Sequence, residues 1–264
     1  MVTAGIDVGN KNTKVVILDG DRILARYSRP TGFGQKDALR EAMAAALDRA
    51  GRRWPDVAAV VATGAGKNEV DFARERITEV GADARGALFL VPAARTVVDV
   101  GAEEGRAIRL DTGGRVADFA MNEKCAAGTG SFTEAMARAL EVELDELGPL
   151  ALKSTRVVPM NAQCVVFAES EVVSLIHART AREDIARAVV DAMAGRIVAM
   201  TRRVGAQGEV VLAGGVARNA AFVKAFGEGL ALPVVVPTAP EYVTALGAAC
   251  AAREKTGDGG KAHV

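Results

Sequence analysis

The chain has 264 residues, of which 50% are apolar and 25% are charged. This length and composition allow one large domain or two modest ones with hydrophobic cores. Its 33 basic and 33 acidic residues balance, so no overall field attracts it to nucleic acid or to an anionic membrane. Three cysteines, without a signal peptide or a membrane-spanning apolar run, predict a cytoplasmic protein without disulfides. With only His177 and His263 present, histidine-rich metal sites are excluded.

The start of the chain is repeated 92 residues later. AGIDVGNKNTKVVILDGDRI aligns with TVVDVGAEEGRAIRLDTGGR, so that residues 6–9 fall on residues 98–101 and Lys14 falls on Arg106. Each copy predicts a strand, a glycine-containing turn, a second strand and a further turn with Asp-Gly or Thr-Gly-Gly chemistry. The repeat therefore predicts a β-hairpin that opens a domain, twice.

Between the two copies, the pattern predicts a helix and two strands. Asp37–Ala50 is rich in alanine, carries apolar residues at helical spacing and is followed by Gly51. Val57–Thr63 is typical of a short buried strand, and we expect another over Ala87–Val91, which ends at Pro92.

The second half continues the alternation. It predicts a strand over Val210–Ala213 and helices over Thr133–Leu140, Glu169–Ala178, Ile185–Val204 and Tyr242–Lys255. Strands alternating with helices favour an α/β architecture of two related lobes. We expect these lobes to span residues 1–94 and 95–264, with the last helix free to pack back on the first lobe.

Two lobes that each open with an acid–glycine hairpin would face one another across a nucleotide cleft. Gly9 and Gly101 would let backbone amides approach a polyphosphate, where a side chain would block them. Lys11 and Lys14 would add positive charge. The candidate nucleotide-binding residues of the first turn are Gly9, Asn10, Lys11, Asn12, Thr13 and Lys14.

The acidic residues of the two hairpins suggest a magnesium site. Mg²⁺ keeps several waters and is usually reached by one or two carboxylates, a role that suits Asp7 and Asp99 at the predicted strand ends. The metal would neutralise charge on the terminal phosphate of ATP. Glu103 or Glu104, just past the second turn, would orient the attacking water.

Two further glycine-rich segments follow predicted strands. In LAGGVARN, Gly214, Gly215 and Asn219 would let an adenine and a ribose lie against the backbone. In TGAGKN, the phosphate-loop pattern GxxxxGK followed by Ser or Thr fails, because Val61 and Asn68 stand at two of its required positions. TGAGKN is then either a tight turn or a turn that lines the cleft.

Two of the three cysteines lie in similar surroundings. Cys125 in NEKCAAGTGSF and Cys164 in NAQCVVFAESE each enter a helix-forming stretch, where amide hydrogens would favour a thiolate. Gly128 and Gly130 of the first run are further candidates for cofactor binding. Three alternatives are open: ligation of an iron–sulfur cluster, burial as small apolar residues, which suits Cys250, and zinc, which is disfavoured without a CxxC pair. A four-iron cluster takes four cysteines, so a second chain would have to supply the others.

The runs GIDVGNKNTK, VVDVG, NEKCAAGTGSF, CVVFAESEVVS and LAGGVARN resemble those of a known family. It comprises the ATPases that activate 2-hydroxyacyl-CoA dehydratases and the related ATPase subunits of benzoyl-CoA reductase. The resemblance implies the duplicated two-lobe actin/hexokinase/Hsp70-like ATPase fold. It also implies a dimer with one [4Fe-4S] cluster on its pseudo-twofold axis, for which Cys125 and Cys164 are the ligands from this chain.

The mechanism implied by the resemblance is an ATP-driven electron gate. Reduced ferredoxin would load the cluster, and hydrolysis of ATP with Mg²⁺ would pass the electron on at low potential.

Gly101-Ala102-Glu103-Glu104, where activators usually carry Gly-Gly-Gln-Asp, resembles the D-type ATPase component of benzoyl-CoA reductase. That component works with a related ATPase subunit and with acyl-CoA-reducing subunits, and this assignment is the favoured one. The alternatives are a homodimeric dehydratase activator and a small-molecule kinase of the same fold without a cluster.

Overall fold

The computed structural model describes residues 1–32, 35–122, 128–160 and 164–257, which fall into two compact units. Unit 1 comprises Met1–Ala94, Leu110–Ala117 and the chain from Glu241 onward. Unit 2 comprises Arg95–Arg109 and Asp118–Pro240. The chain therefore returns from unit 2 to unit 1 twice, briefly over Leu110–Ala117 and again from Glu241.

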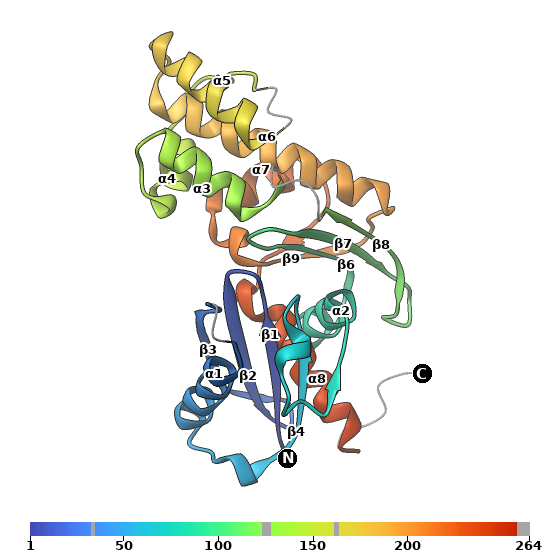
Figure 1. Ribbon diagram of the computed structural model, residues 1–264. Coiled ribbons are helices and arrows are strands. Elements are labelled where there is room, and N and C mark those ends of the chain that lie inside the picture. Colours follow the sequence, from blue (N-terminus) through green and yellow to red (C-terminus); the bar gives the residue numbers. More distant parts are fainter. Residues whose placement is uncertain (33–34, 123–127, 161–163, 258–264) are drawn as a thin grey trace. The chain divides into compact units, whose positions relative to one another are not determined.

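Each unit combines a sheet with helices, as Figure 1 shows, and each begins with three consecutive strands. Unit 1 contains β1 (Val2–Val8), β2 (Asn12–Asp19), β3 (Arg22–Pro30), α1 (Gln35–Ala50), β4 (Val57–Thr63), β5 (Glu75–Arg76), α2 (Glu79–Leu90) and α8 (Val243–Lys255). Unit 2 contains, apart from a few end residues of its first three strands, β6 (Ala94–Val100), β7 (Gly105–Leu110), β8 (Val116–Asn122), α3 (Gly130–Ala139), α4 (Leu144–Leu152), α5 (Val165–His177), α6 (Arg182–Arg203), β9 (Glu209–Ala213), α7 (Ala220–Leu230) and β10 (Val234–Val235).

The repeat in the sequence is a repeat in topology. The strand order of one sheet is β3-β2-β1-β4-β5, and the other sheet reads β8-β7-β6-β9-β10 in the same direction. β1 pairs antiparallel with β2 and parallel with β4, and β6 pairs antiparallel with β7. The predicted pair of opening hairpins is confirmed, and each hairpin is extended by a third strand.

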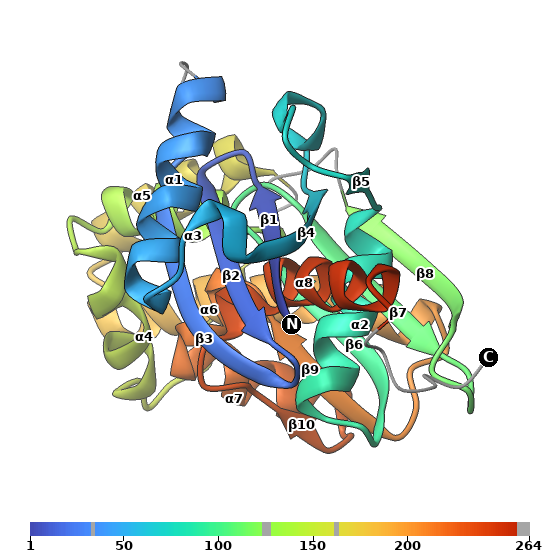
Figure 2. The same cartoon turned by 90° about the horizontal axis from the view of Figure 1, so that it is seen from below.

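In unit 1 the sheet is covered on both faces (Figure 2). Leu39, Met43 and Leu47 of α1 pack with Ile6 and other residues of β1, β2 and β4 on one face. On the other face, α8 packs against residues of β2 and β4, including Val61. Since both faces are covered, β1 and β4 are largely apolar, and their buried polar residues Thr3, Asp7 and Thr63 lie near the strand ends.

Helices α2 and α8 approach each other through glycine. A Cβ atom on Gly247 would lie 1.7 Å from the carbonyl oxygen of Ala82, and one on Gly86 would lie 2.0 Å from the carbonyl oxygen of Val243. These distances are far below van der Waals contact, so no other residue fits at either position without moving a helix.

The prediction of a strand over Ala87–Val91 is wrong, because these residues lie at the end of α2 or directly follow it. A short apolar run is equally typical of a buried strand and of a buried helix. The helix begins after Thr78, whose Oγ1 accepts a hydrogen bond from the backbone N–H of Gly81. That N-cap, which lies upstream of the apolar run, was the missed signal.

In unit 2 one hydrophobic core joins the sheet to the helices α3 to α7. The predicted helices in this part of the chain are confirmed, although α3, α5 and α6 each begin three or four residues earlier than expected. Cys164 is the residue that precedes the first turn of α5.

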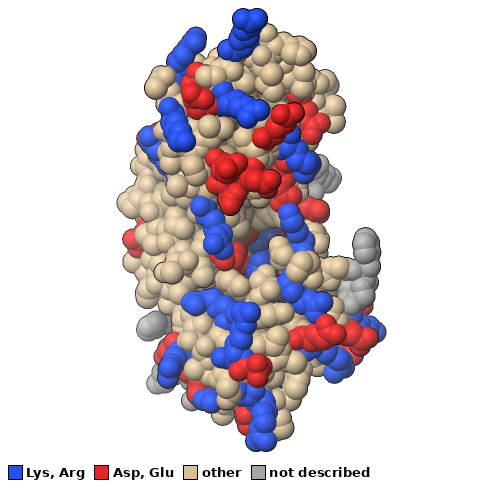
Figure 3. Space-filling model, turned by 90° about the vertical axis from the view of Figure 1, so that its left-hand side faces the viewer, with Lys and Arg blue, Asp and Glu red and all other residues tan. Residues whose placement is uncertain are grey.

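On the face drawn in Figure 3, Lys and Arg side chains are interspersed with Asp and Glu, in keeping with the formal charge of zero. No helix in the described part of the chain combines the length and apolar character that a membrane span requires.

Replacing Gly247 by alanine should destabilise the protein by about 3 kcal/mol, because the new methyl group would push α2 and α8 apart. Gly195→Ala is the matched control, since Gly195 lies in α6 and a Cβ there would meet nothing within 4 Å. The control should gain about 1 kcal/mol from helix propensity. Urea denaturation of both variants measures the difference, and a Gly247→Ala protein as stable as the parent would contradict the packing argument.

Candidate functional site

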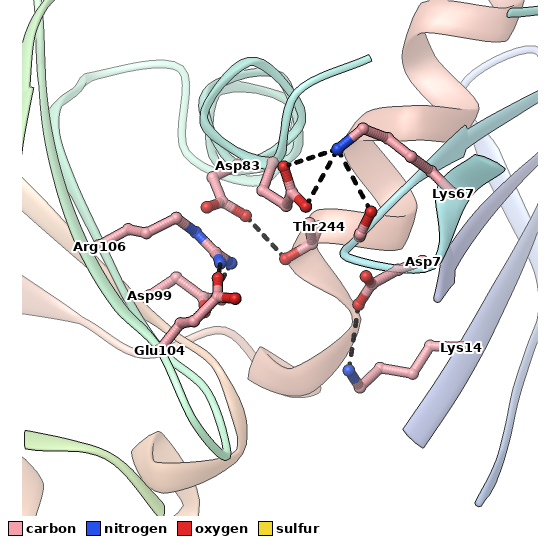
Figure 4. A network of polar contacts seen from close by, with 10 residues as sticks. Asp7, Lys14, Lys67, Asp83, Asp99, Glu104, Arg106 and Thr244 are labelled. Carbon is pink, nitrogen blue, oxygen red and sulfur yellow. Dashed lines mark hydrogen bonds and ion pairs between the residues drawn. The ribbon is translucent and has the colours of Figure 1, made fainter. Parts of the chain in front are cut away.

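The first acid–glycine turn is built around an ion pair. Asp7 lies near the end of β1 directly opposite Lys14 on β2, and Lys14 Nζ lies 3.1 Å from Asp7 Oδ2 (Figure 4). Asp7 is only 6% exposed. The antiparallel register therefore holds a buried carboxylate next to a cation at the end of the hairpin.

The turn between these strands is supported by Thr31, which follows β3. The N–H of Gly9 donates to the carbonyl of Asn12 at 3.2 Å, and Thr31 Oγ1 donates to the carbonyl of Gly9 at 2.7 Å. Thr13 is buried, and its hydroxyl lies 3.1 Å from that of Thr31. Of the candidate residues in this turn, Asn10 and Lys11 are exposed, whereas Thr13 contacts the supporting threonine.

The second turn repeats this arrangement with arginine in place of lysine. Arg106 Nη2 donates to Asp99 Oδ1 at 3.0 Å and Arg106 Nη1 donates to Glu104 Oε2 at 3.1 Å (Figure 4). The N–H of Gly101 donates to the carbonyl of Glu104 at 2.8 Å, as Gly9 does to Asn12 in the first turn. Arg106 therefore holds two carboxylates, while Glu103 is exposed to solvent.

The N-terminus of α3 is attached to the second turn. The N–H of Gly130 donates to the carbonyl of Gly101, and Ser131 donates to the carbonyl of Ala102 through both its N–H and its Oγ, all at 2.7 to 2.8 Å. A Cβ on Gly130 would lie 3.3 Å from the turn, so glycine permits this approach. Gly128 is buried beside Asn122. The glycines of the AAGTG run are thus placed at the turn that carries Asp99.

The LAGGVARN segment follows β9 as a tight turn. Gly214 has φ of +86°, and a Cβ there would lie 2.2 Å from the carbonyl oxygen of Val100 at the end of β6. A Cβ on Gly215, by contrast, would meet nothing within 4 Å. Asn219 caps α7, because its Oδ1 accepts hydrogen bonds from the N–H groups of Ala221 and Phe222. Gly214 is therefore needed by the fold, whereas Gly215 leaves open space.

The TGAGKN segment is the counterpart of that turn in unit 1. Gly64 follows β4 with φ of +91°, and a Cβ there would lie 2.5 Å from the carbonyl oxygen of Val8 at the end of β1. The following helical piece is a single 3-10 turn, Lys67–Glu69, and not the long helix that completes a phosphate loop. Sequence similarity alone did not relate the two segments, but the sheet topology does.

Several polar residues at this end of unit 1 were not singled out from the sequence. Lys67 Nζ lies 3.4 Å from the carboxylate of Glu79 and from the carbonyl of Gly64, and the buried Thr244 donates to Asp83 Oδ1 at 2.7 Å (Figure 4). Thr244 and Asp83 are 161 positions apart, so only the packing of α8 on α2 brings them together.

The three cysteines fall in three different situations. Cys125 lies outside the described residues. Cys164 is partly exposed at the N-cap of α5, where the first-turn N–H groups have no partners within the helix. Cys250 is buried in α8, and this burial raises the pKa of its thiol to about 12. Cys250 is therefore a neutral packing residue, as expected. Within the described ranges, no three His, Cys, Asp or Glu side chains converge where a metal could be held.

Comparison with known proteins finds relatives that match over nearly the whole chain. The chain is 42% identical over 255 residues to an activator of lactoyl-CoA dehydratase from Anaerotignum propionicum, covering 96% of this chain and 98% of the relative. It is 34% identical to the D subunit of benzoyl-CoA reductase from Thauera aromatica, covering 94% and 92%.

Solved structures agree. An activator of the 2-hydroxyisocaproyl-CoA dehydratase from Clostridium difficile, with bound ADPNP, matches at a TM-score of 0.92 and 36% identity over 98% of this chain and 96% of that one. A ROK family glucokinase from Streptomyces griseus, at 16% identity, 96% and 100% coverage and a TM-score of 0.58, shows a likeness of fold alone. The expected two-lobe actin/hexokinase-like fold is confirmed.

The family model that matches spans residues 4–252. The paired acid–glycine hairpins, the duplicated sheets and these relatives agree: the chain belongs to the BadF/BadG/BcrA/BcrD ATPase family.

Proposed function

We propose that this protein hydrolyses ATP to drive electron transfer to a 2-hydroxyacyl-CoA dehydratase, as an activator of that enzyme. The observation that carries the proposal is the pair of acid–glycine turns, each with a buried aspartate held by a basic residue, in a chain 42% identical to a dehydratase activator. We expect it to act in the cytoplasm, where thiols stay reduced.

ATP binding would use both turns. The amides near Gly9 and Gly101 would face phosphate oxygens, and Asp7 and Asp99 would hold Mg²⁺ through water. Phosphoryl transfer to water needs mainly positioning and charge stabilisation, which these groups would provide. Since Glu104 accepts a hydrogen bond from Arg106, we assign the orientation of the attacking water to the exposed Glu103.

The adenosine would lie against Gly215. Among the described residues, a Cβ there would meet nothing within 4 Å, which supports a position where a ligand has room.

The surroundings of Cys164 support the proposal that the protein shares a [4Fe-4S] cluster with a second subunit. Cys164 is accessible, and the first-turn N–H groups of α5 favour a thiolate at this place. When bound, the cluster supplies a one-electron redox centre. Cys125 would be the other ligand from this chain. Apolar side chains on the same helix are exposed and would suit a covering subunit: Val166, Phe167, Val173 and Ile176.

A path from nucleotide to cysteine is supported by the contacts of α3. Gly130 and Ser131 hydrogen-bond to the turn at Gly101 and Ala102, and Cys125 lies only five positions before Gly130. A change in the turn on hydrolysis would therefore pull on the segment that carries this ligand. The nucleotide shifts the segment only by its differential affinity for the two arrangements.

A second candidate is the ATPase subunit of a benzoyl-CoA reductase, with acyl-CoA-reducing subunits and a related ATPase subunit as partners. It is favoured by Gly101-Ala102-Glu103-Glu104, the feature on which the sequence-based assignment depended, and by the 34% identity to the D subunit of that reductase. The higher identity to activators leads us to place the dehydratase first. Ferredoxin is the proposed electron donor for either partner.

Gly215→Ala tests the adenosine position. The variant should be as stable as the parent, because its methyl group meets no protein atom, yet its KM for ATP should rise about tenfold or more as the methyl group occupies ligand space. Steady-state ATP hydrolysis and urea denaturation measure the two effects. An unchanged KM would exclude this position.

Cys164→Ser should lose bound iron and sulfide after anaerobic purification and should no longer form a cluster-bearing dimer. Cys250→Ala is the matched control, since a buried neutral thiol contributes only packing, and it should keep its iron. Iron and sulfide quantification, electron paramagnetic resonance and size-exclusion chromatography measure the outcome. A monomer that retains a complete cluster would contradict the shared site.

The choice between partners is tested by electron delivery. The anaerobically purified protein, supplied with reduced ferredoxin and ATP, should activate a 2-hydroxyacyl-CoA dehydratase and should leave acyl-CoA-reducing subunits of a benzoyl-CoA reductase inactive. The opposite result would establish the second candidate. A protein that binds no iron and phosphorylates a sugar would instead be the kinase considered as a third alternative.

A further inference from the structure

Thr63, the last residue of β4, has a buried hydroxyl that the fold does not use. Its side chain is 0% exposed, and among the described residues its Oγ1 has no hydrogen-bond partner. Buried polar atoms are nearly always hydrogen-bonded in folded proteins, because leaving one unsatisfied costs free energy. A hydroxyl in this situation calls for a partner that the chain does not provide.

The hydroxyl lies on the same face of the sheet as Asp7. In the parallel pairing of β1 with β4, Thr63 is the register partner of Asp7. Thr63 follows Val61, which packs with α8, by two residues. Asp7 follows Gly5 by two residues, and a Cβ on Gly5 would meet the backbone of α8. Since side chains two apart in a strand share a face, both residues point to the α8 side.

The carboxylate of Asp7 extends toward the end of β4. Its Oδ2 accepts a hydrogen bond from Lys14 Nζ. Its Oδ1 lies 2.6 Å from the position that a Cβ on Gly64 would occupy. Gly64 directly follows Thr63. The two carboxylate oxygens are therefore in different surroundings, and Oδ1 is the one next to Gly64.

The matching position in unit 2 carries no hydroxyl. Thr63 and Gly64 correspond to Ala213 and Gly214, which end β9 in the same sheet position and with the same positive φ at the glycine. The duplicated scaffold therefore does not require a hydroxyl at this place. The hydroxyl of Thr63, without a counterpart at Ala213, therefore points to a function specific to unit 1.

We propose that Thr63 Oγ1 positions the hydrated Mg²⁺ at Asp7, by accepting a hydrogen bond from a metal-bound water. This inference rests on the proposed ATP hydrolysis and adds a positioning residue to its metal site. Mg²⁺ retains several waters and needs oxygen acceptors around them, which suits a hydroxyl beside a carboxylate. The TGAGKN segment would then serve the metal and not the phosphates.

The test uses Thr63→Val, which keeps the shape and removes the hydroxyl, together with Thr63→Ala, the residue found in unit 2. Without nucleotide, Thr63→Val should be as stable as the parent or more stable, because an unsatisfied group is removed. The Mg²⁺ concentration for half-maximal ATP hydrolysis should rise about tenfold in both variants, the loss of one hydrogen bond to a charged site. Thr63→Ser should stay close to the parent.

Thr3→Val is the matched control, since Thr3 lies on the same face and its hydroxyl donates to the carbonyl of Ala249. This variant should be less stable and should keep the Mg²⁺ dependence of the parent. If the parent hydrolyses ATP and both Thr63→Val and Thr63→Ala show its Mg²⁺ dependence, the inference fails and the proposed function stands. If the parent itself shows no Mg²⁺-dependent hydrolysis, the proposed function fails and the inference falls with it.

Discussion

The ion pair across each opening hairpin is the constraint on which the site depends. In both units an aspartate near the end of the first strand faces a basic residue on the second, and both acids are nearly buried. A charged group can be buried this deeply only with a partner, and loss of one partner costs about 3–5 kcal/mol. The pairs therefore fix the carboxylates in place. Gly9 and Gly101, two residues after the aspartates, leave the backbone of each turn without a covering side chain.

Given these pairs, the two units differ in ways that suit different tasks. The lysine in unit 1 contacts one carboxylate oxygen of Asp7, whereas the arginine in unit 2 holds Asp99 and Glu104 together. Unit 2 in addition attaches α3 to its turn, and the cysteine run lies just before that helix. The described contacts thus give the two units different polar networks on one duplicated scaffold, an ion pair at the turn of unit 1 and a turn joined to a helix in unit 2.

Glycine residues allow the closest backbone contacts within the two units. Gly64 and Gly214 bring two turns against the ends of β1 and β6, and Gly86 and Gly247 bring two helices into backbone contact. Each of these positions is explained by a close approach. Gly215 differs from them, because a Cβ there would meet nothing within 4 Å among the described residues.

The sequence by itself determined the repeat, the two hairpins, most of the helices and the family, because these depend on local periodicity and on long matching runs. It also singled out Asp7 and Asp99, since the repeat aligned them. Local patterns did not reveal α2, because the short apolar run at its end suits a strand and a helix equally. They also missed Thr63, Thr244 and Asp83, because the surroundings of these residues are made by strand pairing and helix packing between distant parts of the chain. Whether a hydroxyl has a hydrogen-bond partner, or whether a glycine faces a backbone or open space, depends on how distant segments pack together.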